Sequence, residues 1–122
     1  DTILKKMSLK NQKSIYDFVE GKKEVSTNQI CYIESNLHKL TFFLMEREER
    51  KKFTLYGTLN DWEKKLQGDR WLRVHQSFLI NMQYLLDVRN YFAELADGSK
   101  LPVSKARYKQ VREQFAEYMG EL

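Results

Sequence analysis

The most informative part of the chain is Arg73-Val74-His75-Gln76-Ser77-Phe78-Leu79-Ile80-Asn81. It begins with the alternation typical of a strand, with Leu72, Val74 and Phe78 on the apolar side. A cation, an imidazole, an amide and a hydroxyl then follow almost side by side. Inside a core each of these polar groups would need a partner. On a surface they suit the recognition of phosphates and base edges, so the stretch predicts a binding surface carried by a strand and the turn after it.

The composition indicates a single folded domain. The chain has 122 residues, of which 42% are hydrophobic and 13% aromatic, and this is enough to bury a core without disulfides or a metal. Lys and Arg number 21 against 17 acidic residues, a net charge of +4, and the sequence pI is about 9.1. This mild excess is compatible with a polyanionic partner but does not require one.

The single cysteine indicates a reducing compartment. Cys31 lies in the apolar run Ile30-Cys31-Tyr32-Ile33 and has no partner for an internal disulfide. We therefore expect a buried, unreactive thiol and a cytoplasmic protein. No apolar run is long enough to cross a membrane and no signal peptide is present, so no membrane association is expected. The chain begins at Asp1 rather than Met, which suggests a fragment of a longer protein.

Hydrophobic periodicity predicts a mainly β domain with two helices at residues 14–122, after a poorly patterned segment or linker at residues 1–13. Helices are expected at residues 58–67 and 104–121, N-capped by Thr58 and Ser104. Connections that are mostly hairpins imply small antiparallel sheets. The expected strands cover residues 14–20, 23–26, 30–35, 38–45, 52–56, 71–75, 78–81, 84–90, 91–96 and 99–103.

Residues that favour turns separate several of these strands. Gly21-Lys22 is the predicted turn of the first hairpin, residues 46–50 are predicted as a charged loop, and Asp97-Gly98 closes the last hairpin. The only proline, Pro102, lies late in the last strand and indicates an edge position.

No catalytic or cofactor-binding motif is present. The sequence lacks a P-loop, a GxGxxG and a GxSxG motif. One cysteine and two histidines, His38 and His75, provide few of the ligands that a zinc site needs. No spacing favours a catalytic Cys31–His75 pair. We therefore expect a binding module that is not an enzyme and needs neither a cofactor nor a metal.

The last predicted helix carries its charges in an unfavourable order. Lys105, Arg107 and Lys109 occupy its first turns, whereas Glu113 and Glu117 follow. The helix dipole favours the opposite order by about 0.3–1 kcal/mol for a well-placed charge. An anion docked at the helix start would compensate, because free N–H groups and cations converge there. Loosely constrained surface charge explains the same order, so both interpretations stay open on this helix alone.

Several motifs, in this order, resemble the LytTR-type DNA-binding domain, the output module of many bacterial response regulators. Each is loose alone, but their order and spacing are specific together, and the resemblance covers about residues 14 to 119. The motifs are Ile30-Cys31-Tyr32-Ile33-Glu34-Ser35 followed by His38-Lys39-Leu40; Tyr56-Gly57-Thr58-Leu59 at a helix start; Trp71-Leu72-Arg73-Val74-His75-Gln76-Ser77-Phe78-Leu79-Ile80-Asn81; and Leu101-Pro102-Val103-Ser104 before the last helix.

The resemblance implies an elongated arrangement of small antiparallel sheets whose loops enter successive major grooves of double-stranded DNA. It also implies an upstream receiver or sensor domain and a possible homodimer on repeated sites. Arg73, Ser77 and Ser104 would hold phosphates, whereas His38, Gln76 and either Lys105 or Arg107 would contact base edges. The residues that the three DNA-contacting segments bring are His38, Lys39, Arg73, Gln76, Ser77, Ser104, Lys105 and Arg107.

The sequence departs from the family pattern at two of these places. Gln76 stands where a basic residue or Asn is common, but its amide can still bind adenine through two hydrogen bonds. Ala106 stands where many members carry a second basic residue, so Lys105 or Arg107 would have to supply that contact. Base preference is therefore not carried over from the family. Arg73 has an alternative role as a sheet-face cation paired with a neighbouring acid.

Alternatives from other functional classes accompany this hypothesis. A protein-interaction module would use exposed strands or the Tyr91-Phe92 hairpin. An RNA-binding sheet would expose Phe42, Phe43 and both rings of that hairpin for stacking on bases. An enzyme would need a pocket that contains His75 and a perturbed acid.

Overall fold

The computed structural model describes residues 13–66, 68 and 70–120. These residues form ten strands and two α-helices, which confirms the mainly β prediction. Except for Lys13, the predicted N-terminal segment lies outside the described residues. The elements are β1 (Lys13–Phe18), β2 (Gly21–Ser26), η1 (Thr27–Gln29), β3 (Ile30–Asn36), β4 (Lys39–Glu46), β5 (Glu49–Tyr56), α2 (Leu59–Lys65), β6 (Trp71–His75), β7 (Phe78–Asn81), η2 (Met82–Tyr84), β8 (Leu85–Arg89), β9 (Phe92–Leu95), β10 (Lys100–Pro102) and α3 (Tyr108–Gly120).

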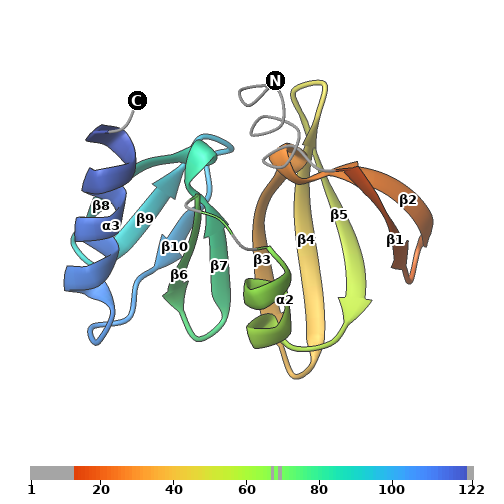
Figure 1. Ribbon diagram of the computed structural model, residues 1–122, viewed down its shortest axis with the longest axis horizontal. Helices are drawn as coiled ribbons and strands as arrows, with labels where there is room; N and C mark the ends of the chain where they lie inside the picture. Colours follow the sequence, from red (N-terminus) through yellow and green to blue (C-terminus); the bar gives the residue numbers. More distant parts are fainter. Residues whose placement is uncertain (1–12, 67, 69, 121–122) are drawn as a thin grey trace, which may run out of the picture.

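The strands form three antiparallel sheets arranged along the longest axis of the molecule (Figure 1). The central sheet has the order β5-β4-β3-β7-β6. The β1–β2 hairpin lies at one end, and the sheet β10-β9-β8 lies at the other end together with α3 (Figure 1). The elongated arrangement of small sheets is thereby confirmed. Pro102 lies in β10, an edge strand as predicted, where its missing N–H costs no ladder hydrogen bond.

Neighbouring residues of the central strands enter two different cores. Tyr32 and Phe43 pack in one core with the three-stranded sheet and with Val111 of α3. Ile33 and Phe42 pack in the other core with β1, β2 and α2. Both faces of the central sheet are therefore buried, which explains why its strands read as nearly continuous apolar runs.

The start of the first predicted helix is confirmed, but that of the second is not. Thr58 caps α2 as expected, since its hydroxyl accepts a hydrogen bond from the Asp61 N–H at 3.2 Å. The second helix, however, begins at Tyr108 and not at Ser104, so the predicted Ser104 cap is wrong. Ser104 N–H instead donates to the Val74 carbonyl oxygen at 3.0 Å, which ties this residue to β6.

The turn of the first hairpin lies at Val19 and Glu20 rather than at Gly21-Lys22, because Phe18 pairs with Gly21. Tertiary hydrogen bonds select this position. The Glu20 carboxylate accepts from the N–H and the hydroxyl of Thr54 at 2.8 and 2.9 Å, and Val19 N–H donates to the Thr54 carbonyl oxygen at 2.8 Å. The turn thus covers part of the free edge of β5.

The charged loop predicted at residues 46–50 is only a two-residue turn. Glu46 pairs with Glu49 across the hairpin, and Arg47 and Glu48 have φ values of 51° and 67°. Two central residues with positive φ make the mirror-image turn that matches the twist of paired strands. Strand β5 consequently begins three residues earlier than predicted.

Candidate nucleic-acid interface

Three connecting segments lie along the lower edge of the molecule in Figure 1. They are the β3–β4 turn at residues 37–38, the β6–β7 turn at residues 76–77, and residues 103–107 before α3. Backbone hydrogen bonds join neighbouring segments. Ser35 N–H donates to the Ser77 carbonyl oxygen at 2.8 Å, and the bond from Ser104 to Val74 ties the third segment to β6. We call this surface, made by the three segments, the loop edge.

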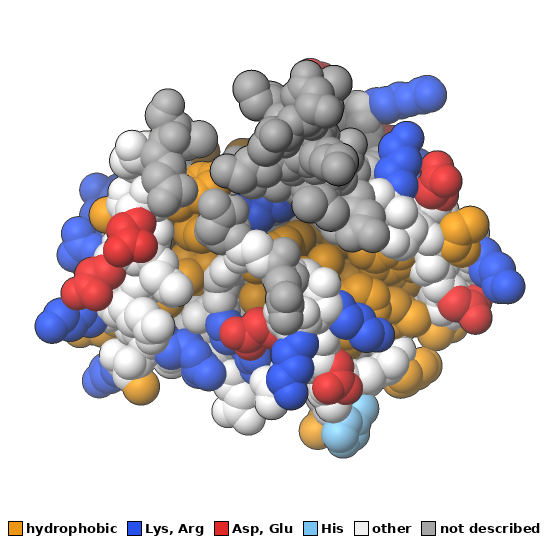
Figure 2. All heavy atoms as spheres, in the orientation of Figure 1, with side chains coloured by type: hydrophobic (Ala, Val, Ile, Leu, Met, Phe, Trp, Pro, Cys, Tyr) orange, Lys and Arg blue, Asp and Glu red, His pale blue; other side chains and the backbone are white. Residues whose placement is uncertain are grey.

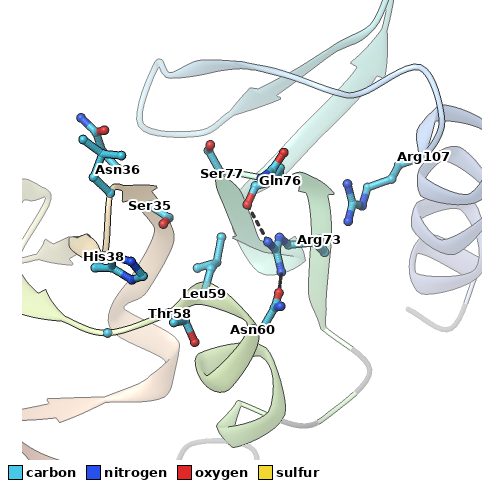
Figure 3. A pocket seen from close by; sticks show the side chains of 12 residues that line it. Ser35, Asn36, His38, Thr58, Leu59, Asn60, Arg73, Gln76, Ser77 and Arg107 are labelled. Atoms are coloured by element: carbon cyan, nitrogen blue, oxygen red, sulfur yellow. Dashed lines mark hydrogen bonds between the residues drawn. The ribbon is translucent and has the colours of Figure 1, made fainter.

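A cleft of about 600 Å³ opens at the loop edge (Figure 3). Five of the eight predicted binding residues line it, whereas Lys39, Ser104 and Lys105 do not. Most of the lining side chains are polar, so the cleft suits a polar ligand better than an apolar one. The lining residues are Ser35, Asn36, Leu37, His38, Gly57, Thr58, Leu59, Asn60, Arg73, Gln76, Ser77 and Arg107.

Arg73 lines this cleft, and its guanidinium is hydrogen-bonded within the protein. Its Nη1 donates to Asn60 Oδ1 and to Glu63 Oε1, each at 2.8 Å. Its Nε donates to the His75 carbonyl oxygen at 2.8 Å, and its Nη2 donates to that of Gln76 (Figure 3). Four of the five N–H groups of the guanidinium are thus occupied. The alternative of a sheet cation paired with an acid describes this geometry.

The β6–β7 turn carries Gln76 with its side chain exposed. His75 Nδ1 accepts a hydrogen bond from Ser77 N–H at 3.1 Å, which closes the turn from inside. At the other end of β7, the buried Asn81 side chain donates to the Ile30 carbonyl oxygen at 3.0 Å. Most polar side chains of this stretch are therefore hydrogen-bonded within the protein. The exposed Gln76 side chain is left free to contact a ligand.

The β3–β4 turn is tight and anchored. Leu37 and His38 have φ values of 50° and 63°, and they connect Asn36 directly to its pairing partner Lys39. The His38 carbonyl oxygen accepts a hydrogen bond from Gly57 N–H at 2.8 Å, which fastens the turn to the segment before α2. The exposed His38 side chain lines the cleft, whereas Lys39 lies outside it.

The third segment brings Arg107 to the cleft, where it reaches from the start of α3 toward the β6–β7 turn (Figure 3). Lys105 is exposed. The Ser104 hydroxyl oxygen is buried and has no hydrogen-bond partner in the described part of the chain, so a phosphate contact would require it to turn outward. The Tyr108 ring stacks on Tyr91 with centroids 4.2 Å apart, which holds the start of α3 against the β8–β9 turn.

Charges of both signs surround the loop edge. Figure 2 shows Lys and Arg side chains spread over the lower part of the molecule, with Asp and Glu side chains between them. On the face shown, the charged side chains of the described residues are therefore interspersed and not gathered in one patch of a single sign. The sequence analysis did not identify Asn60 and Leu37 as cleft residues. Asn60 lies in a predicted helix with no motif that marks it as a binding residue, and Leu37 looks like an ordinary apolar residue.

A family model described as the LytTr DNA-binding domain matches residues 21–116. The match includes all three segments of the loop edge. This chain belongs to the LytTR family. The family is one of DNA-binding domains and not of enzymes, so the LytTR domain described here has DNA as its expected partner.

Curated relatives of this LytTR domain are bacterial sensory transduction proteins named LytT. The Bacillus subtilis (strain 168) protein is 35% identical over 65 residues, 49% of this chain and 27% of the relative. The Enterococcus faecalis protein is 27% identical over 94 residues, 73% of this chain and 37% of the relative. The Bacillus cereus protein is 30% identical over 93 residues, 72% and 36% respectively. The chain thus matches about a quarter to somewhat over a third of the length of these relatives.

The LytTR domain also shares its fold with the solved LytTr DNA-binding domain of a Bacillus cereus protein. The TM-score is 0.69 at 19% sequence identity, and the match covers 85% of this chain and 95% of that one. Neither described helix is long and apolar enough to cross a membrane. Among the described residues, His, Cys, Asp and Glu side chains form no group of three or more that could hold a metal ion.

Proposed function

We propose that this LytTR domain recognises specific double-stranded DNA sequences as the output domain of a bacterial two-component response regulator in the cytoplasm. The loop edge is the observation that supports this most directly, because it presents donors, acceptors and cations from three segments along one side of the molecule. Loops grouped on one edge can follow one face of a duplex. In the major groove they meet a pattern of donors and acceptors that differs for each base pair.

Base contacts are assigned to side chains that line the cleft and keep free polar groups. The Gln76 amide can bind the N6 and N7 atoms of adenine through two hydrogen bonds, and Arg107 can bind the O6 and N7 atoms of guanine. His38 stands at the tip of the β3–β4 hairpin and can donate or accept. These three side chains come from the three different segments, so each would contact a different part of the operator.

Phosphate contacts are assigned to Ser77, which lies beside Gln76 in the cleft lining, and to two exposed cations outside the lining. Lys39 directly follows His38 in the sequence, and Lys105 precedes Arg107 by two residues. Ser104 belongs to this set only if its buried hydroxyl turns outward when DNA binds. Such contacts set the register of the protein on the duplex without reading the sequence.

Arg73 is assigned to positioning instead of the phosphate contact that the family resemblance implies. Its guanidinium has one N–H group left, and Glu63 Oε1 at 2.8 Å offsets its charge. A cation in this state contributes little to the attraction of a phosphate. It does hold the backbone of the turn that carries Gln76.

The longer relatives support the larger assembly that we propose. LytT proteins extend well beyond the matched region, and they are sensory transduction proteins. We place this domain downstream of a receiver or sensor domain that controls homodimer formation on repeated DNA sites. A homodimer of this kind would bind two half-sites on one face of the duplex.

The RNA-binding and protein-interaction alternatives have weaker support. Phe42 and Phe43 are buried, so two of the four rings needed for an RNA-stacking sheet are inaccessible. The other two rings already have partners, since Tyr91 stacks on Tyr108 and the Lys100 ammonium lies 4.9 Å from the Phe92 ring centroid. Tyr91 thereby supports the start of α3, whereas Phe92 contacts β10, and both rings remain partly exposed.

Selection of random duplexes against the domain, repeated at two salt concentrations, tests the proposed function. We expect an enriched motif, an affinity for it about 10³-fold or more above random DNA, and a log–log salt slope of about −0.9 for each phosphate neutralised. Equal affinity for all duplexes would contradict sequence recognition. Binding to a protein partner that does not respond to salt, with no motif enriched, would favour the interaction module.

A further inference from the structure

Leu37 stands in an unfavourable place for a leucine. It is 90% exposed, more than any other large hydrophobic residue in the described part of the chain. Its φ of 50° lies in the left-handed region, which Gly, Asn and Asp tolerate and which is strained for a bulky side chain. Water exposure and backbone conformation therefore both disfavour this residue in the free protein.

Neither the turn nor the packing requires leucine here. Mirror-image two-residue turns favour Asn or Gly. The other two turns with this pattern of φ values carry Arg47 and Glu48, which are charged, and Asn90 and Tyr91. Asn90 suits the conformation, and the Tyr91 ring is packed against α3. Leu37, by contrast, leaves its side chain in water.

Leu37 lies among the residues that we assign to DNA contacts. It precedes His38 at the hairpin tip and lines the cleft together with Gln76 and Ser77. The other leucine of the lining, Leu59, is the first residue of α2 and is buried. The exposed apolar surface of the cleft therefore comes chiefly from Leu37, which projects from the loop edge beside polar groups.

The major groove offers one apolar group to such a side chain, the C5-methyl group of thymine. We propose that Leu37 is a specificity-determining residue that packs on the C5-methyl group of a thymine, next to the bases contacted by His38 and Gln76. This inference rests on the proposed function. Contact would remove both apolar groups from water and so offset the cost that Leu37 imposes on the free protein.

An apolar wedge between stacked bases is the main other use of such a residue. Wedges belong to proteins that enter and bend the minor groove. The amide of Gln76 and the imidazole of His38 instead match the groups displayed in the major groove, which favours the methyl contact. The two uses differ in whether the methyl group itself matters, and a chemical substitution in the DNA separates them.

The test uses the full chain and the duplex enriched by selection. Each thymine of the site is replaced singly by deoxyuridine, which removes the methyl group and keeps every hydrogen-bonding group. At one position we expect the wild-type protein to bind about fourfold more weakly, the equivalent of ~0.8 kcal/mol for one buried methyl-sized group. The same measurements are made on Leu37→Asn, which suits the turn, and on Leu86→Asn, a control on an exposed leucine of β8 outside the cleft.

The expected result is that Leu37→Asn binds the thymine and uracil duplexes equally, whereas Leu86→Asn keeps the fourfold difference. Thermal unfolding of Leu37→Asn at or above the wild-type temperature would show that the lost discrimination is not a loss of folding. A preference for thymine that survives in Leu37→Asn, or an equal loss of affinity on both duplexes, would overturn the inference. If selection enriches a motif but uracil has no effect anywhere, only this inference fails; if no motif is enriched, the proposed function fails with it.

Discussion

Arg73 Nη1 lies 2.8 Å from Glu63 Oε1, so the guanidinium joins α2 to the β6–β7 turn. The Arg73 side chain is 11% exposed and that of Glu63 is 46% exposed. A half-exposed ion pair stabilises a protein little by itself. Here the same guanidinium also binds the carbonyl oxygens of His75 and Gln76. The pair therefore sets the backbone of the Gln76 turn before DNA is present.

Replacing Arg73 separates positioning from phosphate binding. We expect Arg73→Gln to weaken binding of the selected duplex while leaving the salt slope nearly unchanged. Arg73→Lys keeps the charge but cannot reproduce the fork of hydrogen bonds, so it should weaken binding similarly. Affinities at three salt concentrations distinguish the two roles. A slope shallower by about one unit in Arg73→Gln, with normal binding by Arg73→Lys, would establish a phosphate contact.

Gln76→Ala should weaken the selected duplex by about 1–3 kcal/mol if its amide binds one base through two hydrogen bonds. Binding to random DNA should change little, because no phosphate contact is removed. Gln83→Ala is the matched control, since Gln83 is exposed in η2 outside the cleft. An equal loss on selected and random duplexes would remove Gln76 from base recognition.

Replacing Lys105 and replacing Arg107 should have different effects on DNA binding. Lys105 is exposed and does not line the cleft, so Lys105→Ala should weaken all duplexes alike and reduce the salt slope by about one unit. Arg107 lines the cleft, so Arg107→Ala should mainly reduce the preference for the selected duplex. Lys51→Ala, on β5 and outside the cleft lining, is the charge-matched control. Interchanged effects would reverse the two assignments.

Glu20 should make stability depend on pH. The backbone N–H of Thr54 holds the pKa of the Glu20 carboxyl below its ordinary value of 4.5, slight desolvation of this exposed side chain opposes the shift, and the Thr54 hydroxyl and Lys39 add to the lowering. Because the folded-state pKa is the lower one, ionised Glu20 stabilises the fold at neutral pH, and this stabilisation is lost as the pH falls below about 4.5 toward the folded-state value.

Urea unfolding at pH 7 and pH 3 checks this. Glu20→Gln should be less stable than the wild type at pH 7, and the difference should shrink at pH 3, because protonation of the Glu20 carboxylate removes the charge that Gln lacks. Glu24→Gln, on the exposed face of the same hairpin, should have little effect at either pH. A Glu20→Gln deficit of equal size at both pH values would show that charge plays no part.

Local pattern was sufficient to place most elements of this domain, although α3 begins four residues later and β5 three residues earlier than predicted. Alternating apolar residues predicted most of the strands, and the Thr58 cap located the start of α2, because strand faces and first helical turns depend on residues close in the sequence. Turn position was less predictable. The first turn lies at Glu20 because Thr54, far along the chain, holds its carboxylate.

The site shows the same division. Its residue types were visible in the sequence, since Arg73, Gln76 and His38 stand in motifs that resemble the LytTR pattern. Which of them remain free to contact a ligand depended on partners that no local pattern contains. Asn60 and Glu63 occupy the Arg73 guanidinium, and sheet register brings the three segments to one edge. Hydrogen-bonding capacity is finite, so a side chain satisfied inside the fold is no longer free to bind DNA.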